Sequence, residues 1–285
     1  MESRDLRTTD LLCKTDDAKI LRLRFAPLRM TIRSYFPKGV ILLNCFITSS
    51  PFLDGVAPAT LSNANGFIDR IRGCLPANPY VVFVASDPKD HAGTCQFAAI
   101  TTAAFAQAGI AFSGYQVLDG TSVHRAYGMI AHCDFVVLCG GHAPTQNAFF
   151  RKIRLRHILH NFQGTVMGIS AGSMNMAGIV YVQPEESGES SPEFRRFAPG
   201  LALTPVNILP HYQKAKDYWL DGKRLYEDVT YTDSIGHEFF ALPDNSYFFQ
   251  DDDGLLLCGK AYRLRDGIME QLTGDEDVLD TVLLD

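Results

Sequence analysis

The stretch GTVMGISAGSMNMAG (residues 164–178) joins a short apolar run to a serine between glycines and a tail of small residues. The apolar run predicts a buried strand, and the small residues predict a helix packed closely against a sheet. Ser170 falls at the turn between them, where Gly168 and Gly172 allow a sharp bend that carries Oγ outward. A hydroxyl presented in this way is typical of a nucleophile, although G-x-S-x-G alone is a weak motif.

The chain before this stretch alternates between apolar runs and amphipathic segments. Wholly apolar strands separated by helices predict a mostly parallel sheet with helices on both faces, which is an α/β fold. Beyond residue 180 the pattern becomes β-rich. The expected strands are 39–50, 80–86, 111–119, 134–141 and 164–170, and the expected helices are 62–74, 87–109, 121–133 and a long one after Pro144 carrying Leu155, Ile158, Leu159 and Phe162 at helical spacing.

The domain organisation follows from length and composition. The chain has 285 residues, which is enough to bury a sizeable core. Residues 1–38 mix charges with short apolar pieces and have no sustained period, so they are interpreted as an N-terminal extension. Residues 39–285 contain no internal repeat and no low-complexity linker, and they are expected to form a single α/β domain.

Charge and cysteine content limit the classes of partner. A net charge of −6 gives no electrostatic reason to expect nucleic acid or an anionic membrane. The seven cysteines are scattered without a CxxC pair, which indicates a reducing compartment and argues against a structural zinc site. No apolar run reaches the roughly 20 residues that a membrane span needs. We therefore expect a cytoplasmic protein, either a monomer or a homodimer, with no nucleic-acid or membrane partner.

A serine nucleophile also needs donors for an oxyanion, and two segments offer them. Ala171 places a backbone N–H at the start of a helix, where such groups stabilise negative charge. Gly140 and Gly141 end the preceding strand and let the backbone approach a ligand closely, although a simple strand-to-helix turn would use the same glycines. His142 follows them and is a candidate substrate contact.

The base and its carboxylate have to come from elsewhere in the chain. Among eight histidines, His211 is distinguished because Pro210 stops the strand before it, so its ring emerges at a strand end. His237, in DSIGHEFFALPD, is the rival. Asp244, in ALPDNSYF, lies between two apolar strands and is the candidate carboxylate, with an ordinary Asp-Asn-Ser turn as the alternative interpretation.

With these residues in view, the sequence resembles the aspartyl dipeptidase (dipeptidase E) and cyanophycinase family of serine peptidases. The resemblance covers roughly residues 40 to 265 and rests on four ordered pieces: LCGGHAPTQN, GISAGSMN, ILPHY and ALPDNSYF. It implies a flavodoxin-like fold similar to that of the class I glutamine amidotransferases. It also implies that Ser170 is the nucleophile, that His211 is the general base, and that Gly141 and Ala171 supply the oxyanion amides. Asp244 falls where dipeptidase E has a glutamate, which is one methylene longer.

The resemblance further implies a small peptide substrate and acyl transfer without a metal or an organic cofactor. Dipeptidase E pairs an arginine with the aspartate side chain of its substrate, and Arg224 in DYWLDGKRLYED has a comparable spacing. A planar guanidinium suits such a carboxylate. The GGHAPTQN piece differs from the dipeptidase E form after the glycines, so Asp-X specificity is a weaker expectation than peptide hydrolysis.

Two alternatives from other classes remain open at this point. An esterase-type α/β-hydrolase would use the chain order serine, acid, histidine, which Ser170, Asp217 or Asp221, and His237 satisfy. Only about 115 residues follow the serine, without clear further βα units, which counts against it. The other alternative is a non-catalytic binding protein on the same scaffold, in which Ser170 is a turn residue.

Overall fold

The computed structural model describes residues 43–280. The predicted extension, residues 1–38, and the start of the first expected strand lie outside the described residues. The main sheet has eight strands in the order β16-β13-β12-β1-β5-β4-β2-β3. Its strands are β1 (Asn44–Thr48), β2 (Tyr80–Val84), β3 (Gly114–Leu118), β4 (Phe135–Leu138), β5 (Thr165–Ile169), β12 (Tyr247–Gln250), β13 (Leu255–Cys258) and β16 (Val278–Asp280).

Strands β1 to β5 of this sheet pair in parallel, and β12, β13 and β16 extend it in antiparallel fashion. Strands β1, β2, β4 and β5 are almost entirely buried, as expected for a sheet covered on both faces, whereas β3 at the edge of the sheet is partly exposed. The prediction of a mostly parallel α/β sheet is confirmed.

A second sheet accounts for much of the β-rich C-terminal part, which is also confirmed. It has four strands in the order β15-β14-β11-β8. They are β8 (Ile208–Leu209), β11 (Glu238–Ala241), β14 (Ala261–Arg265) and β15 (Ile268–Thr273). Two small ribbons complete the strands, β6 (Ile179–Tyr181) with β7 (Phe197–Pro199), and β9 (Trp219–Leu220) with β10 (Lys223–Arg224).

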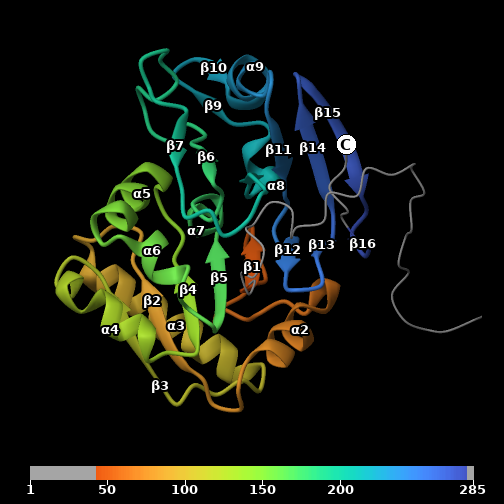
Figure 1. Cartoon of the computed structure of the whole chain (residues 1–285). Helices are drawn as coiled ribbons and strands as arrows, with labels where there is room; N and C mark the ends of the chain where they lie inside the picture. Colours follow the sequence, from red (N-terminus) through yellow and green to blue (C-terminus); the bar gives the residue numbers. More distant parts are fainter. Residues whose placement is uncertain (1–42, 281–285) are drawn as a thin grey trace, which may run out of the picture.

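The helices cover both faces of the main sheet (Figure 1). Aromatic side chains of α2 and α3, such as Phe67 and Phe105, pack with Phe46 and Phe135 in one buried cluster. Side chains of α4, α5, α6 and α7 form a second cluster on the opposite face. The helical elements are η1 (Ala64–Gly66), α2 (Phe67–Cys74), α3 (His91–Gln107), η2 (Val123–Arg125), α4 (Ala126–Ala131), α5 (Ala143–Lys152), α6 (Leu155–Leu159), α7 (Ala171–Met174), α8 (Tyr212–Ala215), η3 (Leu225–Thr230) and α9 (Tyr231–Asp233).

The prediction of one long helix after Pro144 is wrong, because the chain makes two helices there. Helix α5 ends at Lys152, and Arg154 takes a left-handed conformation with φ 55° before α6 begins. A residue in that conformation cannot continue a right-handed helix. Leu155 and Leu159 are nevertheless fully buried. The predicted apolar face is therefore present, although it lies on a separate helix.

The carboxyl end of β5 leads directly into α7, and β8 leads into α8 through one intervening loop. Figure 1 shows α7 at the upper end of β5 and α8 beside the upper end of β1. The two sheets therefore bring their strand ends to a common edge, where parallel α/β proteins hold their ligands. Among the described helices, none is both long and apolar enough to cross a bilayer.

Candidate active site

Ser170 occupies a strained turn between β5 and α7. Its backbone has φ 53° and ψ −117°, a combination rarely adopted by a residue with a side chain. The flanking glycines are required by close packing. A Cβ on Gly168 would lie 2.6 Å from the Ser173 Cα, and a Cβ on Gly172 would overlap the Leu138 carbonyl. The turn is therefore built so that the serine hydroxyl stands at the strand end.

The histidine and the carboxylate come from the second sheet. Strands β8 and β11 pair in parallel, with Leu209 opposite Ala241. A proline follows soon after each strand, Pro210 after β8 and Pro243 after β11. The Tyr212 amide donates to the Leu242 carbonyl at 3.1 Å and so links the two segments that follow the strands. His211 and Asp244 consequently emerge side by side, although they are 33 residues apart.

These three side chains form a continuous hydrogen-bonded chain. His211 Nε2 lies 2.9 Å from Ser170 Oγ, and His211 Nδ1 lies 2.6 Å from Asp244 Oδ1. Burial alone would raise the pKa of the Asp244 carboxyl, but the hydrogen bond and charge of His211 outweigh it and lower that pKa to about 2. An ionised Asp244 fixes the imidazole with Nδ1 protonated, which leaves Nε2 free to accept the serine proton.

Ser49, at the end of β1, contacts all three of these residues and was not identified from the sequence. Its Oγ donates to Asp244 Oδ1 at 2.9 Å and accepts from the His211 amide at 2.7 Å. Its carbonyl accepts from the Ser170 amide at 3.0 Å. The side chain is fully buried. The one available signal was the position of Ser49 at a strand end on the same edge as Ser170.

The second oxygen of Asp244 is also occupied. Gln213 Nε2 donates to Asp244 Oδ2, and the Asp244 amide donates back to Gln213 Oε1 at 3.0 Å. Lys214 Nζ lies 3.2 Å from the same oxygen. Both oxygens of this nearly buried carboxylate are therefore held in place, and its orientation toward His211 is fixed.

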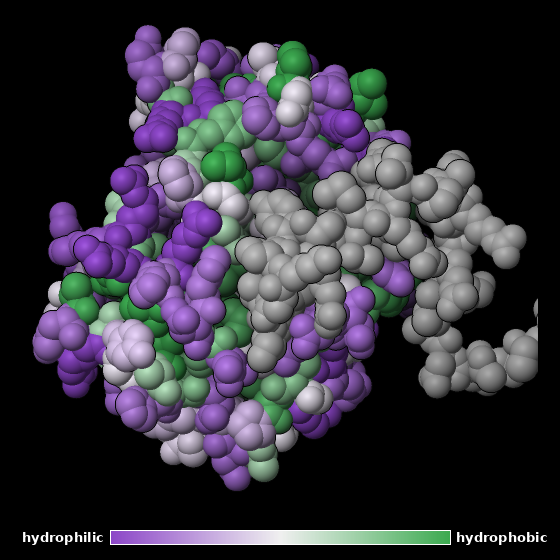
Figure 2. Space-filling model, viewed as in Figure 1, coloured by the Kyte–Doolittle hydropathy of each residue, from purple (hydrophilic) through white to green (hydrophobic). Residues whose placement is uncertain are grey.

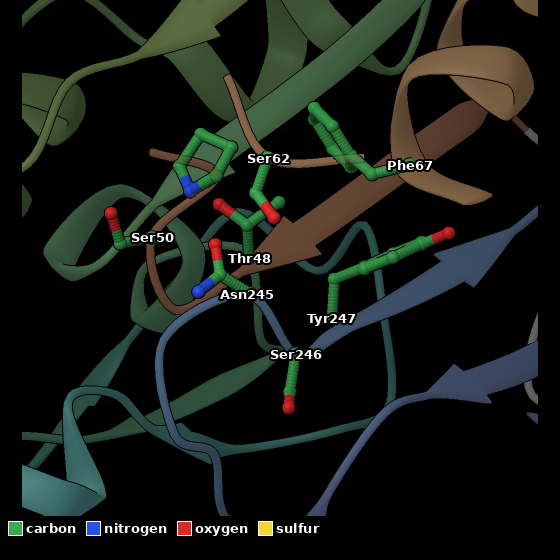
Figure 3. Close-up of a pocket in the computed structure, with 8 residues that line it drawn as sticks. Thr48, Ser50, Ser62, Phe67, Asn245, Ser246 and Tyr247 are labelled. Atoms are coloured by element: carbon green, nitrogen blue, oxygen red, sulfur yellow. The ribbon is translucent and has the colours of Figure 1, made fainter. Parts of the chain in front are cut away.

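The loops that carry these residues pack tightly against one another. Figure 3 shows Thr48, Ser50 and Asn245 lining a small hollow between the end of β1 and the start of β12. Its volume is about 10 Å³, close to the lower limit for a single water molecule. The Asn245 amide donates to the Ser50 carbonyl at 2.8 Å, which ties the Asp244 loop to the Ser49 loop.

The two residues expected to supply oxyanion donors, Gly141 and Ala171, both lie next to Ser170 or to a neighbour of it. The neighbouring Gly140 touches Ser170, because a Cβ on Gly140 would lie 3.5 Å from the Ser170 Cβ. Gly141 has φ 150°, and a Cβ there would overlap Ser86 Oγ, so only glycine fits. Within residues 43–280, neither the Gly141 nor the Ala171 amide donates a hydrogen bond to the protein. The described part of the chain thus gives neither N–H group an acceptor.

His142 is held by two side chains. Its Nδ1 lies 2.8 Å from Thr145 Oγ1, and its Nε2 lies 2.9 Å from Glu189 Oε1 in the acidic loop after β6. His142, Glu186 and Glu189 have side-chain donor atoms within 4.8 Å of one another, which is close enough to ligate a metal ion. Glu189 already accepts hydrogen bonds from the backbone amides of Glu185 and Glu186, so a purely structural role in holding the loop also accounts for this cluster.

Arg224 lies on β10 and pairs with Asp228. Its Nη2 is 2.6 Å from Asp228 Oδ1, and its Nε and its amide both donate to Asp228 Oδ2. Both oxygens of this carboxylate are thereby engaged, and the pairing lowers the pKa of Asp228 to about 2. A substrate carboxylate at Arg224 would have to compete with an internal partner.

The residues of the esterase alternative do not meet in the described part of the chain. The ring of His237 packs against Phe197 in a tilted arrangement, with ring centroids 4.3 Å apart. Asp221 accepts hydrogen bonds from Ser187 Oγ and the Gly188 amide, in a different loop. The histidine that reaches Ser170 is His211.

Similarity to known proteins lies in the structure and not in the sequence. No family model and no curated protein sequence matches the chain. Among solved structures, a peptidase from an acI-B1 actinobacterium superposes with a TM-score of 0.60 at 14% identity, covering 85% of this chain and 98% of that one. A provisionally assigned peptidase E protein from Listeria monocytogenes EGD-e gives 0.50 at 15% identity, covering 81% and 100%. The chain therefore shares the fold of these proteins.

Proposed function

We propose that this chain is a serine peptidase of the dipeptidase E type, hydrolysing short peptides through Ser170, His211 and Asp244. The observation that carries the proposal is the unbroken sequence of hydrogen bonds from Ser170 Oγ through the imidazole to the Asp244 carboxylate. The strained backbone of Ser170 and the two unused amides beside it also support the proposal. The fold shared with two peptidases is consistent with it.

In the proposed reaction His211 Nε2 takes the proton of Ser170 as the oxygen attacks the peptide carbonyl. The amides of Gly141 and Ala171 donate to the oxyanion that forms. The imidazolium, stabilised by the ionised Asp244, then protonates the leaving amine. Water attacks the acyl-enzyme by the same route in reverse and regenerates Ser170. The first of these proton transfers joins Ser170 Oγ and His211 Nε2, which lie 2.9 Å apart.

The test compares the wild type with Ser170→Ala on a panel of dipeptides, with Asp-X and Glu-X beside neutral pairs. Loss of turnover in the variant supports the serine mechanism, and a fluorophosphonate probe should label the wild type but not the variant. Absence of both turnover and labelling in the wild type would contradict the proposal. Turnover of short-chain esters alone would favour an esterase on the same residues.

Specificity is tested separately through Arg224. If this arginine binds a substrate carboxylate, Arg224→Gln should reduce kcat/KM for Asp-X and leave neutral dipeptides unaffected. Asp228→Asn should have the opposite effect, because it removes the internal partner of the guanidinium. Equal effects on Asp-X and neutral peptides in both variants would show that Arg224 has only a structural role.

A further inference from the structure

Positive charge is concentrated in one segment of an otherwise acidic chain. The whole chain has a net charge of −6, yet no aspartate or glutamate occurs between Asp134 and Glu185. The fully charged side chains of this segment all lie on α5, on α6 or at the junction between them. They are Arg151, Lys152, Arg154 and Arg156.

The three arginines of this segment line a single cavity. The cavity has a volume of about 690 Å³, within the usual range for a small-molecule site. Figure 2 shows strongly hydrophilic side chains over α5 and α6. The cavity is lined by Arg151, Arg154, Arg156, His157, His160 and the segment Pro199–Leu201.

The break between α5 and α6 is what assembles this lining. A continuous helix would place successive residues at 100° intervals, so Arg151, Arg154 and Arg156 would not share one narrow face. The left-handed turn at Arg154 redirects the chain, and all three line the same cavity. The positive φ of a non-glycine residue is itself costly and calls for a compensating interaction.

These arginines lack counter-charges in the described structure. Within residues 43–280, Arg151, Arg154 and Arg156 make no ion pair and no side-chain hydrogen bond. Some arginines elsewhere on the surface are paired, as Arg72 is with Asp69, so the absence of a partner is shared by all three arginines of this cavity but is not general. Three unpaired guanidinium groups around one cavity repel one another, and a ligand with several negative oxygens would relieve that repulsion.

We propose that this cavity, the arginine cavity, binds a small molecule carrying a condensed phosphate chain. Guanidinium groups donate in a planar fork that matches phosphate oxygens, and the ring of His157 adds a further hydrogen-bonding group, whereas His160 Nε2 already donates to the Leu201 carbonyl at 3.2 Å. None of Ser170, His211 and Asp244 lines the cavity. The site is therefore separate from the proposed peptidase centre, and it stands whether or not that proposal holds.

Calorimetric titration of the full-length chain with tripolyphosphate at low ionic strength tests the proposal. The cavity variant replaces Arg151, Arg154 and Arg156 by Gln. Its matched control replaces Lys89, Arg125 and Lys152 by Gln, which removes the same charge from exposed positions outside the cavity lining. We expect binding to weaken at least about tenfold in the cavity variant and by less than about threefold in the control, as removal of direct phosphate contacts should do.

Further arms identify the source of the phosphate chain and guard against misfolding. Competition with ATP but not with adenosine indicates that the phosphates are recognised, and stronger competition by ATP than by tripolyphosphate indicates a nucleotide. Circular dichroism melting establishes that each variant is folded, and Arg156→Gln alone serves if the triple variant is not. No binding by the wild type, or equal losses in the two triple variants, would overturn the proposal.

Discussion

Replacing Ser49 by alanine tests how the proposed catalytic residues are held in place. The substitution removes the hydroxyl that donates to Asp244 Oδ1 and accepts from the His211 amide. Alanine is smaller than serine and uncharged, so it fits the fully buried position of Ser49 without a clash. The carboxylate keeps its contacts with Gln213, so the structure should survive while the geometry loosens.

The size of the effect follows from the bonds lost. A hydrogen bond to a charged group is worth about 1.5–3 kcal/mol, and a buried amide left without an acceptor costs about 1–3 kcal/mol. We therefore expect Ser49→Ala to lower the free energy of unfolding by roughly 2–4 kcal/mol, since the two terms overlap. If about 1.5–3 kcal/mol of this acts on the transition state, kcat falls roughly 10- to 100-fold. KM should change little, because Ser49 is fully buried and is not exposed to a substrate.

The assay measures kcat and KM on the best dipeptide, together with the rate of fluorophosphonate labelling of Ser170. Ser50→Ala is the matched control, because its hydroxyl accepts only a 3.4 Å bond from the Phe52 amide and touches none of the proposed catalytic groups. Removing Ser49 also removes a hydrogen bond that lowers the pKa of Asp244, so that pKa should rise. If Ser49→Ala changed KM alone, or matched Ser50→Ala in kcat, the positioning argument would be refuted.

Three further predictions concern the oxyanion site, pH and thiol reactivity. Gly141→Ala should lower kcat by about 10²–10³, because the new Cβ would overlap Ser86 Oγ and displace a donor; Gly128→Ala, which has open space around it, is the control and should be near neutral. The lowered pKa of Asp244 stabilises the fold above its ordinary value of 3.8 and loses this effect as pH falls toward 2. Urea unfolding of wild type and Asp244→Asn should therefore differ at pH 6 and converge near pH 2; a constant difference would contradict this. Iodoacetamide should label the partly exposed Cys95 before the fully buried cysteines, two of which have pKa values raised to about 12 by burial, and peptide mass spectrometry would reveal the opposite order.

The parallel sheet was predictable because its strands are apolar runs of about five residues separated by amphipathic segments. The break at Arg154 was not, because neither glycine nor proline marks it and the apolar spacing continues through it. Tertiary packing imposes the left-handed residue there, and a periodicity argument only reports which face is buried. The same break sets the arginine cavity, which therefore had no sequence signal beyond the run of basic residues.

Some residues of the proposed site could be predicted from local sequence, and others depend on contacts between distant segments. Ser170, Gly141 and Ala171 could be placed from local sequence, because each belongs to a strand-to-helix turn with its own glycines. Ser49 could not, because its bonds to His211 and Asp244 span 162 and 195 positions. Contacts of that range depend on which strands become neighbours, and β1 lies beside β5 only after a crossover through three other strands.

The aspartate at position 244 is where the sequence departs from its resemblance, and the structure supplies a physical reason that the shorter side chain suffices. Because β8 and β11 pair in parallel, the segments that follow them lie side by side. The Asp244 carboxylate therefore reaches His211 Nδ1 at 2.6 Å without a further methylene. A short side chain has fewer rotamers to restrain, and Ser49 and Gln213 hold one oxygen each. The position of the backbone lets the aspartate reach the imidazole, and the carboxylate is fixed, nearly buried and ionised beside it.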